Sequence, residues 1–172
     1  AEKKAQGRSI EWLQADMRVL DDVPTTDAVT LFSDSLCYLT DFEDVVSVFE
    51  AVYDHLEEGG IFLFDVHSLY QMQEVFPGYQ YHFVEDDFAF LWQSYELDEP
   101  GSVEHVIDMY IKQEDGNLYE HFQEVHEEQT FPIEMYEAAL EMVGFTNIKV
   151  KADFGQSEVQ ETSPRWFFQA VK

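Results

Sequence analysis

The segment from residue 28 to residue 66 constrains the fold more than any other feature of this sequence. It opens with an apolar, β-branched run at 28–32, which predicts a buried strand. Residues 43–56 then carry apolar side chains at helical spacing, and Gly59-Gly60 is expected to end that helix. The nearly continuous apolar run 61–66 follows as a second buried strand. A strand, a helix and a strand in this order form a βαβ unit, which implies a parallel sheet covered by helices.

The pattern changes near residue 80, where strand-like alternation replaces the helical period. The runs 88–95, 103–112 and 117–131 predict an antiparallel insert of about three strands, with a hairpin turn signal at 114–117. One face of the insert is expected to pack on the main domain, and the other to serve as a lid or as a homodimer surface. Most aromatic side chains in strands belong to a packed core. The aromatic residues in question are Phe88, Phe90, Trp92, Tyr95, Tyr110 and Phe122.

The parallel pattern returns after the insert. Thr130 and Pro132 mark the start of a helix that Gly144 ends, and the runs 145–154 and 166–171 predict two further strands. The predicted organisation is a core part at 1–79, the insert at 80–131, and a helix with strands at 132–172 that completes the core sheet.

Charge excludes several classes of partner. The 172 residues include 36 acidic and 9 basic side chains, for a formal net charge of −27. Nucleic-acid binders present a basic patch to phosphates, and an anionic membrane would repel this surface, so neither partner is expected. Cys37 is the only cysteine, which excludes an intramolecular disulfide. No apolar run approaches the roughly 20 residues of a membrane helix. These observations predict a protein of the reduced cytoplasm.

Four pieces in sequence order carry a resemblance to a known family: IEWLQADMRVL, DAVTLFSDSLCYL, HLEEGGIFLFDVHS and FPIEMYEAALEMVGF. With them, nearly the whole chain resembles class I S-adenosylmethionine-dependent methyltransferases, and within these the small uncharacterised bacterial members with a β-insert. The resemblance implies an α/β, Rossmann-like sheet. It also implies S-adenosylmethionine as cofactor, S-adenosylhomocysteine as product and a small-molecule acceptor.

The family's most diagnostic motif is not in this sequence. The resemblance implies a glycine-rich loop of the kind DxGxGxG after the first strand, and an acidic residue at the end of the second strand. Neither is found here, and the run 10–13 matches the third strand. In the family's sheet order, 3-2-1-4-5-7-6, strands one and two separate strand three from strand four. We therefore expect the first two central strands to be missing and these residues to be part of a longer polypeptide.

The resemblance also implies which residues bind the cofactor. Asp16 would accept from the adenine amino group, and the backbone at Met17 would meet a ring nitrogen. Ligands of open α/β sheets lie beyond the carboxyl ends of the strands, where a further polar group follows the strand at 28–32. This group consists of Ser33, Asp34, Ser35 and Tyr38, of which Ser33 and Tyr38 would contact the methionine part. The plainer alternatives remain open: Asp16, Asp34 and Ser35 as loop or cap residues, and Tyr38 as a core residue.

Catalytic residues are not marked by a strong motif. Methyl transfer from a sulfonium needs donor and acceptor held in line more than it needs acid–base groups. The weak candidates are Tyr38 and His67, which follows the predicted strand at 61–66. For a histidine in such a position, a hydrogen-bonded structural role is the more common interpretation. No histidine pair has zinc-like spacing beside a carboxylate, so no metal site is expected.

Two other functions compete with a methyltransferase. A non-catalytic acidic module could keep the fold and bind a basic partner, and binding of the methyl donor would separate it from an enzyme. A nucleotide-dependent oxidoreductase would carry a GxGxxG fingerprint, which is absent.

Overall fold

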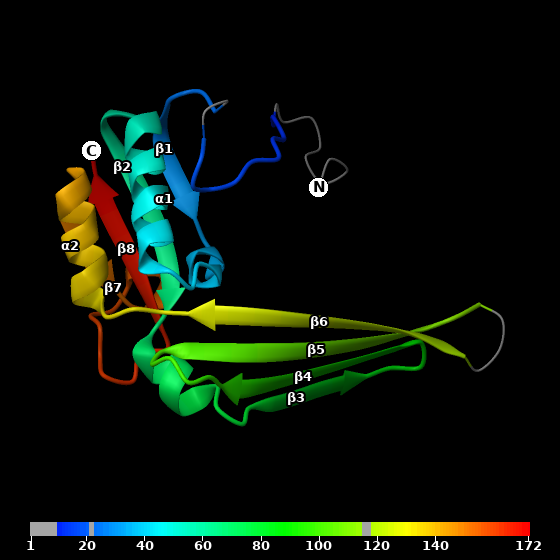
Figure 1. Cartoon of the computed structure of the whole chain (residues 1–172). Coiled ribbons are helices and arrows are strands. Elements are labelled where there is room, and N and C mark those ends of the chain that lie inside the picture. Colours follow the sequence, from blue (N-terminus) through cyan, green and yellow to red (C-terminus); the bar gives the residue numbers. More distant parts are fainter. Residues whose placement is uncertain (1–9, 21–22, 115–117) are drawn as a thin grey trace.

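A computed structural model describes residues 10–20, 23–114 and 118–172 of the chain. Its strands form two sheets, which lie one above the other in Figure 1. The first sheet has the strand order β1-β2-β8-β7, and the second is an antiparallel meander with the order β3-β4-β5-β6. The predicted α/β class is confirmed.

The predicted βαβ unit is confirmed as β1 (Thr26–Leu31), α1 (Phe42–His55) and β2 (Leu56–His67), with β1 and β2 parallel. The side chain of Asp41 caps α1 by accepting from the Glu43 backbone N–H at 2.9 Å. The helix ends at His55, so the prediction that Gly59-Gly60 stops it was wrong, and both glycines lie within β2. A Cβ at Gly60 would lie 3.2 Å from the backbone oxygen of Asp27, so this glycine lets β2 approach β1 closely.

The chain returns to the first sheet after the insert. It forms α2 (Ile133–Val143), β7 (Thr146–Lys151) and β8 (Arg165–Val171), with β8 antiparallel between β2 and β7. Gly144 ends α2 in the left-handed conformation, as predicted. The strand order β1-β2-β8-β7 corresponds to the 4-5-7-6 half of the order that the resemblance implies.

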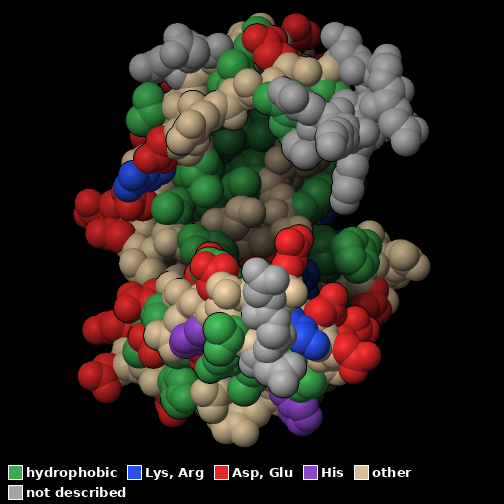
Figure 2. All heavy atoms as spheres, turned by 90° about the vertical axis from the view of Figure 1, so that its right-hand side faces the viewer, with side chains coloured by type: hydrophobic (Ala, Val, Ile, Leu, Met, Phe, Trp, Pro, Cys, Tyr) green, Lys and Arg blue, Asp and Glu red, His purple; other side chains and the backbone are tan. Residues whose placement is uncertain are grey.

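The main core lies between the first sheet and the two helices, which cover the same face of it (Figure 1). Phe64 of β2 stacks on Phe168 of β8 with ring centroids 4.5 Å apart, and Phe49 of α1 packs on Phe64. Figure 2 shows a separate hollow, lined by hydrophobic side chains, between the part that holds this core and the antiparallel sheet.

The insert has one strand more than predicted. Its strands are β3 (Gln80–Val84), β4 (Phe88–Glu96), β5 (Ser102–Lys112) and β6 (Tyr119–Gln129). Every residue of the edge strand β3 is exposed, so this strand has no alternation of buried and exposed positions. The predicted hairpin turn falls on residues 115–117, which lie outside the described residues.

The strand predicted at 10–13 is not formed. Ile10, Trp12 and Leu13 are about half exposed, and an isolated bridge between Asp16 and Val19 is the nearest pairing among the described residues. A strand needs a neighbour for its backbone groups, and no described residue pairs with 10–13. Within the three described ranges, no helix has the length and apolar character needed to cross a membrane.

Candidate functional site

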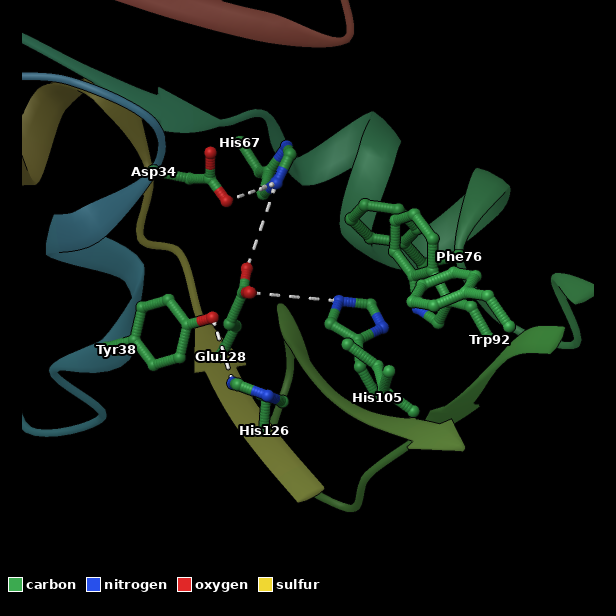
Figure 3. Close-up of a pocket in the computed structure, with 10 residues that line it drawn as sticks. Asp34, Tyr38, His67, Phe76, Trp92, His105, His126 and Glu128 are labelled. Atoms are coloured by element: carbon green, nitrogen blue, oxygen red, sulfur yellow. Dashed lines mark hydrogen bonds and ion pairs between the residues drawn. The ribbon is translucent and has the colours of Figure 1, made fainter. Parts of the chain in front are cut away.

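Three side chains from distant parts of the sequence meet at the edge of the first sheet (Figure 3). Asp34 follows β1, His67 ends β2, and Glu128 comes from β6 of the insert. The Nε2 atom of His67 lies 3.2 Å from Asp34 Oδ2 and 3.7 Å from Glu128 Oε2. We call these three residues the polar cluster.

Local structure explains why the polar cluster assembles. Because β1 and β2 are parallel, Asp34 and His67 leave the sheet at the same edge. Ser33 and Asp34 both have positive φ, 63° and 51°, which turns the chain sharply into the 3₁₀ helix η2 (Ser35–Tyr38). The Thr130 hydroxyl donates to the backbone oxygen of His67 at 2.7 Å, and this bond fixes the end of β6 to the end of β2. Glu128 is thereby held against His67.

Arg165 of β8 stabilises the polar cluster from one side. Its Nη1 donates to Asp34 Oδ1 at 2.8 Å and also to the buried Asp65 of β2. Burial alone would raise the pKa of Asp34, but hydrogen bonds from His67 and Arg165 outweigh it and lower that pKa to about 2. Asp34 is therefore a carboxylate at neutral pH.

Glu128 has the opposite environment. Only 4% of it is exposed, and its Oε2 has no hydrogen-bond partner among the described residues. Burial raises its pKa, and His67 opposes this effect only in part. A ligand that donates a hydrogen bond would therefore find an unsatisfied acceptor here.

A pocket of about 230 Å³ opens beside the polar cluster. Phe76 packs edge-on against His67, with ring centroids 5.0 Å apart, and against His105 at 4.7 Å. The residues that line the pocket are Asp34, Tyr38, His67, Phe76, Phe90, Trp92, His105, Ile107, His126 and Glu128. The pocket thus has acidic groups at one end and aromatic walls, a combination typical of small-molecule sites.

Two further histidines belong to the pocket. His105 is buried on β5 and shares a hydrogen bond with the Ser94 hydroxyl at 2.7 Å, and burial lowers its pKa to about 4. His126 of β6 pairs through Nδ1 with the Tyr38 hydroxyl at 3.0 Å. Burial also raises the pKa of Tyr38 to about 12, so its hydroxyl stays protonated at neutral pH.

The structure brings some of the predicted site residues together. Asp34, His67 and Tyr38 all line the pocket. Tyr38 is 47% exposed and is no core residue, and the Nδ1 atom of His67 is buried without a partner among the described residues. Because His67 is also hydrogen-bonded to Asp34 through Nε2, the alternative of a structural histidine stays open. Ser33 lies at the same strand end, and the Ser35 hydroxyl donates to the Phe32 backbone oxygen at 2.9 Å.

Asp16 and Met17 are not part of this pocket. The Asp16 carboxylate binds Arg18 at 2.7 Å, and Arg18 also binds Asp44 of α1 at 2.8 Å. Met17 packs against the main core. The two ion pairs of Arg18 hold the segment around residues 16–18 on α1.

Sequence reasoning missed several residues of the pocket. Glu128, Arg165, Phe76 and the buried role of His105 were not singled out as site residues. The only sequence signal for Glu128 is its even spacing from Glu124 and His126, which places all three on one face of β6.

The polar cluster has spacing that suits a metal ion, because its three donor atoms lie within 4.8 Å of one another. Two observations count against a metal. Arg165 already places a positive charge on Asp34. A histidine that binds a metal usually donates its second ring N–H to an acceptor, and His67 Nδ1 has none among the described residues. That there is no metal site stays a prediction.

Known proteins resemble this chain in sequence and in fold. No family model matches the chain. A protein named "Putative methyltransferase GWCH70_2453" from Geobacillus sp. strain WCH70 is 37% identical over 172 residues, which are 100% of this chain and 69% of that protein. "Putative methyltransferase YqeM" of Bacillus subtilis strain 168 is 38% identical over 172 residues, with 99% of this chain and 69% of that protein covered.

A solved structure agrees with these relatives. The crystal structure of an S-adenosylmethionine-dependent methyltransferase from Clostridium acetobutylicum has a TM-score of 0.86 and 26% identity to this chain. The similarity covers 99% of this chain and 68% of the clostridial one. The chain belongs to the class I S-adenosylmethionine-dependent methyltransferases, so it is a transferase of the EC 2.1.1 group and its cofactor is S-adenosylmethionine.

Proposed function

We propose that this methyltransferase acts on a small-molecule acceptor that binds in the pocket beside the polar cluster. The observation that supports this most is the convergence of Asp34, His67 and Glu128 at the carboxyl ends of two parallel strands, facing a cavity of about 230 Å³. This volume lies just below the range of about 300–1,000 Å³ that is usual for small-molecule sites, so the pocket suits a compact molecule and is too small for a folded partner.

The residues present fit the two ends of the cofactor. S-adenosylmethionine supplies a methyl group that its sulfonium already activates. In our proposal, the exposed Asp16 carboxylate exchanges Arg18 for the adenine amino group, and the backbone at Met17 meets a ring nitrogen. The turn after β1 contacts the methionine part. This turn contributes Ser33, Asp34, Ser35 and Tyr38.

Within that turn, Asp34 would act through its backbone, because its carboxylate is held by Arg165 and His67. The glycine-rich cradle of the family is not among the residues of this sequence. The proposed contacts therefore cover the adenine and methionine ends and leave the ribose without an assigned partner.

His67 and Tyr38 are the proposed catalytic residues. His67 Nε2 donates to Asp34 and lies 3.7 Å from Glu128 Oε2, so it would orient the acceptor and the carboxylate that takes up the acceptor's proton. The Tyr38 hydroxyl would position the acceptor from the opposite wall. The insert, residues 80–131, would act as a lid that excludes water, and dimerisation through it stays a prediction.

Calorimetric titration with S-adenosylmethionine and S-adenosylhomocysteine is the direct test. We expect both to bind, and His67→Gln to keep that binding while methyl transfer falls at least about tenfold. His82→Gln, in an exposed position of β3, is the matched control and should change neither. If neither compound binds to the folded chain or to a version that carries the family's glycine-rich loop, the acidic binding module is the better interpretation.

A further inference from the structure

The charge around the pocket is not balanced. Asp34 and the buried Asp65 share the single guanidinium of Arg165. Glu128 has no lysine or arginine partner in the part of the chain that the structure describes. The side chains nearest to its carboxylate that can become positively charged are His67, with Nε2 at 3.7 Å, and His105, with Nε2 at 4.0 Å. His105 is neutral at pH 7, because burial lowers its pKa to about 4. The pocket therefore carries excess negative charge that a cationic ligand would neutralise.

Glu128 presents an acceptor to that ligand. Its side chain is 5% exposed, and the unpartnered Oε2 points toward His67 at the acidic end of the pocket (Figure 3). Burying a carboxylate without a partner is costly. A hydroxyl ligand would satisfy the hydrogen bond alone, whereas an ammonium group would satisfy both the hydrogen bond and the charge.

The walls of the pocket suit a cation as well. Phe76 and Trp92 lie with ring centroids 6.0 Å apart, and Phe90 and Tyr38 complete the aromatic lining. Aromatic faces attract cations, most strongly where water is excluded. Among the described residues, no lysine or arginine lines the pocket, so its lining offers no fixed positive charge to repel a cation.

From these observations we infer that the methyl acceptor is a primary or secondary amine, which enters as an ammonium ion, and that Glu128 receives its proton. The inference rests on the proposed function and names the substrate class of the same pocket. It assigns to Glu128 a catalytic contact with the acceptor.

Proton transfer precedes methyl transfer in this reaction. The ammonium group transfers one proton to the Glu128 carboxylate and becomes a neutral amine. The nitrogen lone pair forms a bond to the methyl carbon while the carbon–sulfur bond breaks, and the electron pair of that bond stays on sulfur. The products are a methylated ammonium ion and neutral S-adenosylhomocysteine. Glu128 then returns its proton to solvent when the product leaves the pocket, which restores the carboxylate.

A matched pair of probes tests the inference by calorimetry. Cyclohexylamine and cyclohexanol have the same ring and differ in an ammonium against a hydroxyl group. We expect the wild-type chain to bind cyclohexylamine at least tenfold more tightly, and Glu128→Gln to reduce this ratio to about twofold or less. Glu127→Gln removes the same charge from an exposed neighbouring position of β6 and should keep the ratio.

Three results would overturn the inference. The first is equal affinity of the two probes for the wild-type chain, and the second is an unchanged ratio in a folded Glu128→Gln variant. The third is tight binding of zinc chloride that both Glu128→Gln and His67→Gln abolish, without any preference for the amine. The proposed function is tested separately by S-adenosylmethionine binding, so loss of cofactor binding with a retained amine preference would contradict that function alone.

Discussion

Arg165 Nη1 donates to Asp34 Oδ1 over 2.8 Å and so joins the last strand of the chain to the turn after the first. The same guanidinium binds Asp65, of which only 2% is exposed. Two acidic groups, one of them deeply buried, thus depend on one cation for their neutralisation. Stability and the shape of the candidate site are coupled at this residue.

Replacing Arg165 is therefore expected to destabilise the fold strongly. Arg165→Met keeps most of the side-chain volume but leaves Asp65 as a buried charge without a partner, which typically costs about 3–5 kcal/mol. Urea unfolding followed by circular dichroism measures this free energy. The control is Lys151→Met, whose partner Glu158 is 75% exposed, and its cost should stay below about 1 kcal/mol. Equal losses of stability in the two variants would show that Arg165 does not compensate the buried charge of Asp65.

Much of the first sheet could be predicted because its signals are local. The apolar period of α1, the apolar run of β2 and the glycine after α2 each lie within a few consecutive residues. The strand predicted at 10–13 does not form, because an apolar run does not supply the neighbouring strand that its backbone groups need for hydrogen bonding.

The candidate site was predicted only in part for the same reason. Asp34 and His67 follow from parallel strands that end together. Glu128 depends on the register of β5 with β6 and on the bond from Thr130 to His67, neither of which has a local signature. In the acidic run before Thr130, even spacing groups Glu128 with Glu124 and His126, but nothing in the sequence shows that this face of β6, and not the face of Glu127, is the buried one.

The loop between β4 and β5 offers a test of close backbone packing near the site. Gly101 and Gly78 have similar positive φ, 80° and 74°, but a Cβ at Gly101 would lie 2.7 Å from the Thr130 backbone oxygen, whereas Gly78 has nothing within 4 Å. Gly78→Ala should cost about 1 kcal/mol from backbone strain alone, and Gly101→Ala about 1–3 kcal/mol more. Because Thr130 binds the backbone of His67, Gly101→Ala should also shift the His67 resonances in NMR spectra. Similar costs for the two variants would contradict the close approach of this loop to Thr130.

His105 predicts a loss of stability in mild acid. Burial, with smaller contributions from His67 and His126, lowers its pKa from about 6.5 to about 4 in the folded chain. The unfolded chain then binds more protons between these two values, so the free energy of unfolding falls as the pH falls from 6.5 to 4. His105→Gln should flatten that fall in urea unfolding at a series of pH values, and His82→Gln on the exposed β3 should not. Parallel curves for all three proteins would show that His105 is not kept neutral by the fold.

For Glu128 we expect stability to depend on pH with the opposite sign. Because burial raises the pKa of Glu128, its ionised form is disfavoured in the folded chain. Its contribution to the free energy of unfolding is therefore fully present below pH 4.5 and is lost as the pH rises through the pKa of Glu128 in the folded chain. Glu128→Gln should therefore unfold with a free energy higher by roughly 1 kcal/mol at about pH 7.5 and show no such gain at about pH 4, while Glu127→Gln changes little at either pH. A variant that gains stability and loses its preference for amines would show that Glu128 is kept at this buried position for its chemistry. A Glu128→Gln variant that is less stable near neutral pH would instead mean that an ion pair with protonated His67 outweighs the burial of the carboxylate.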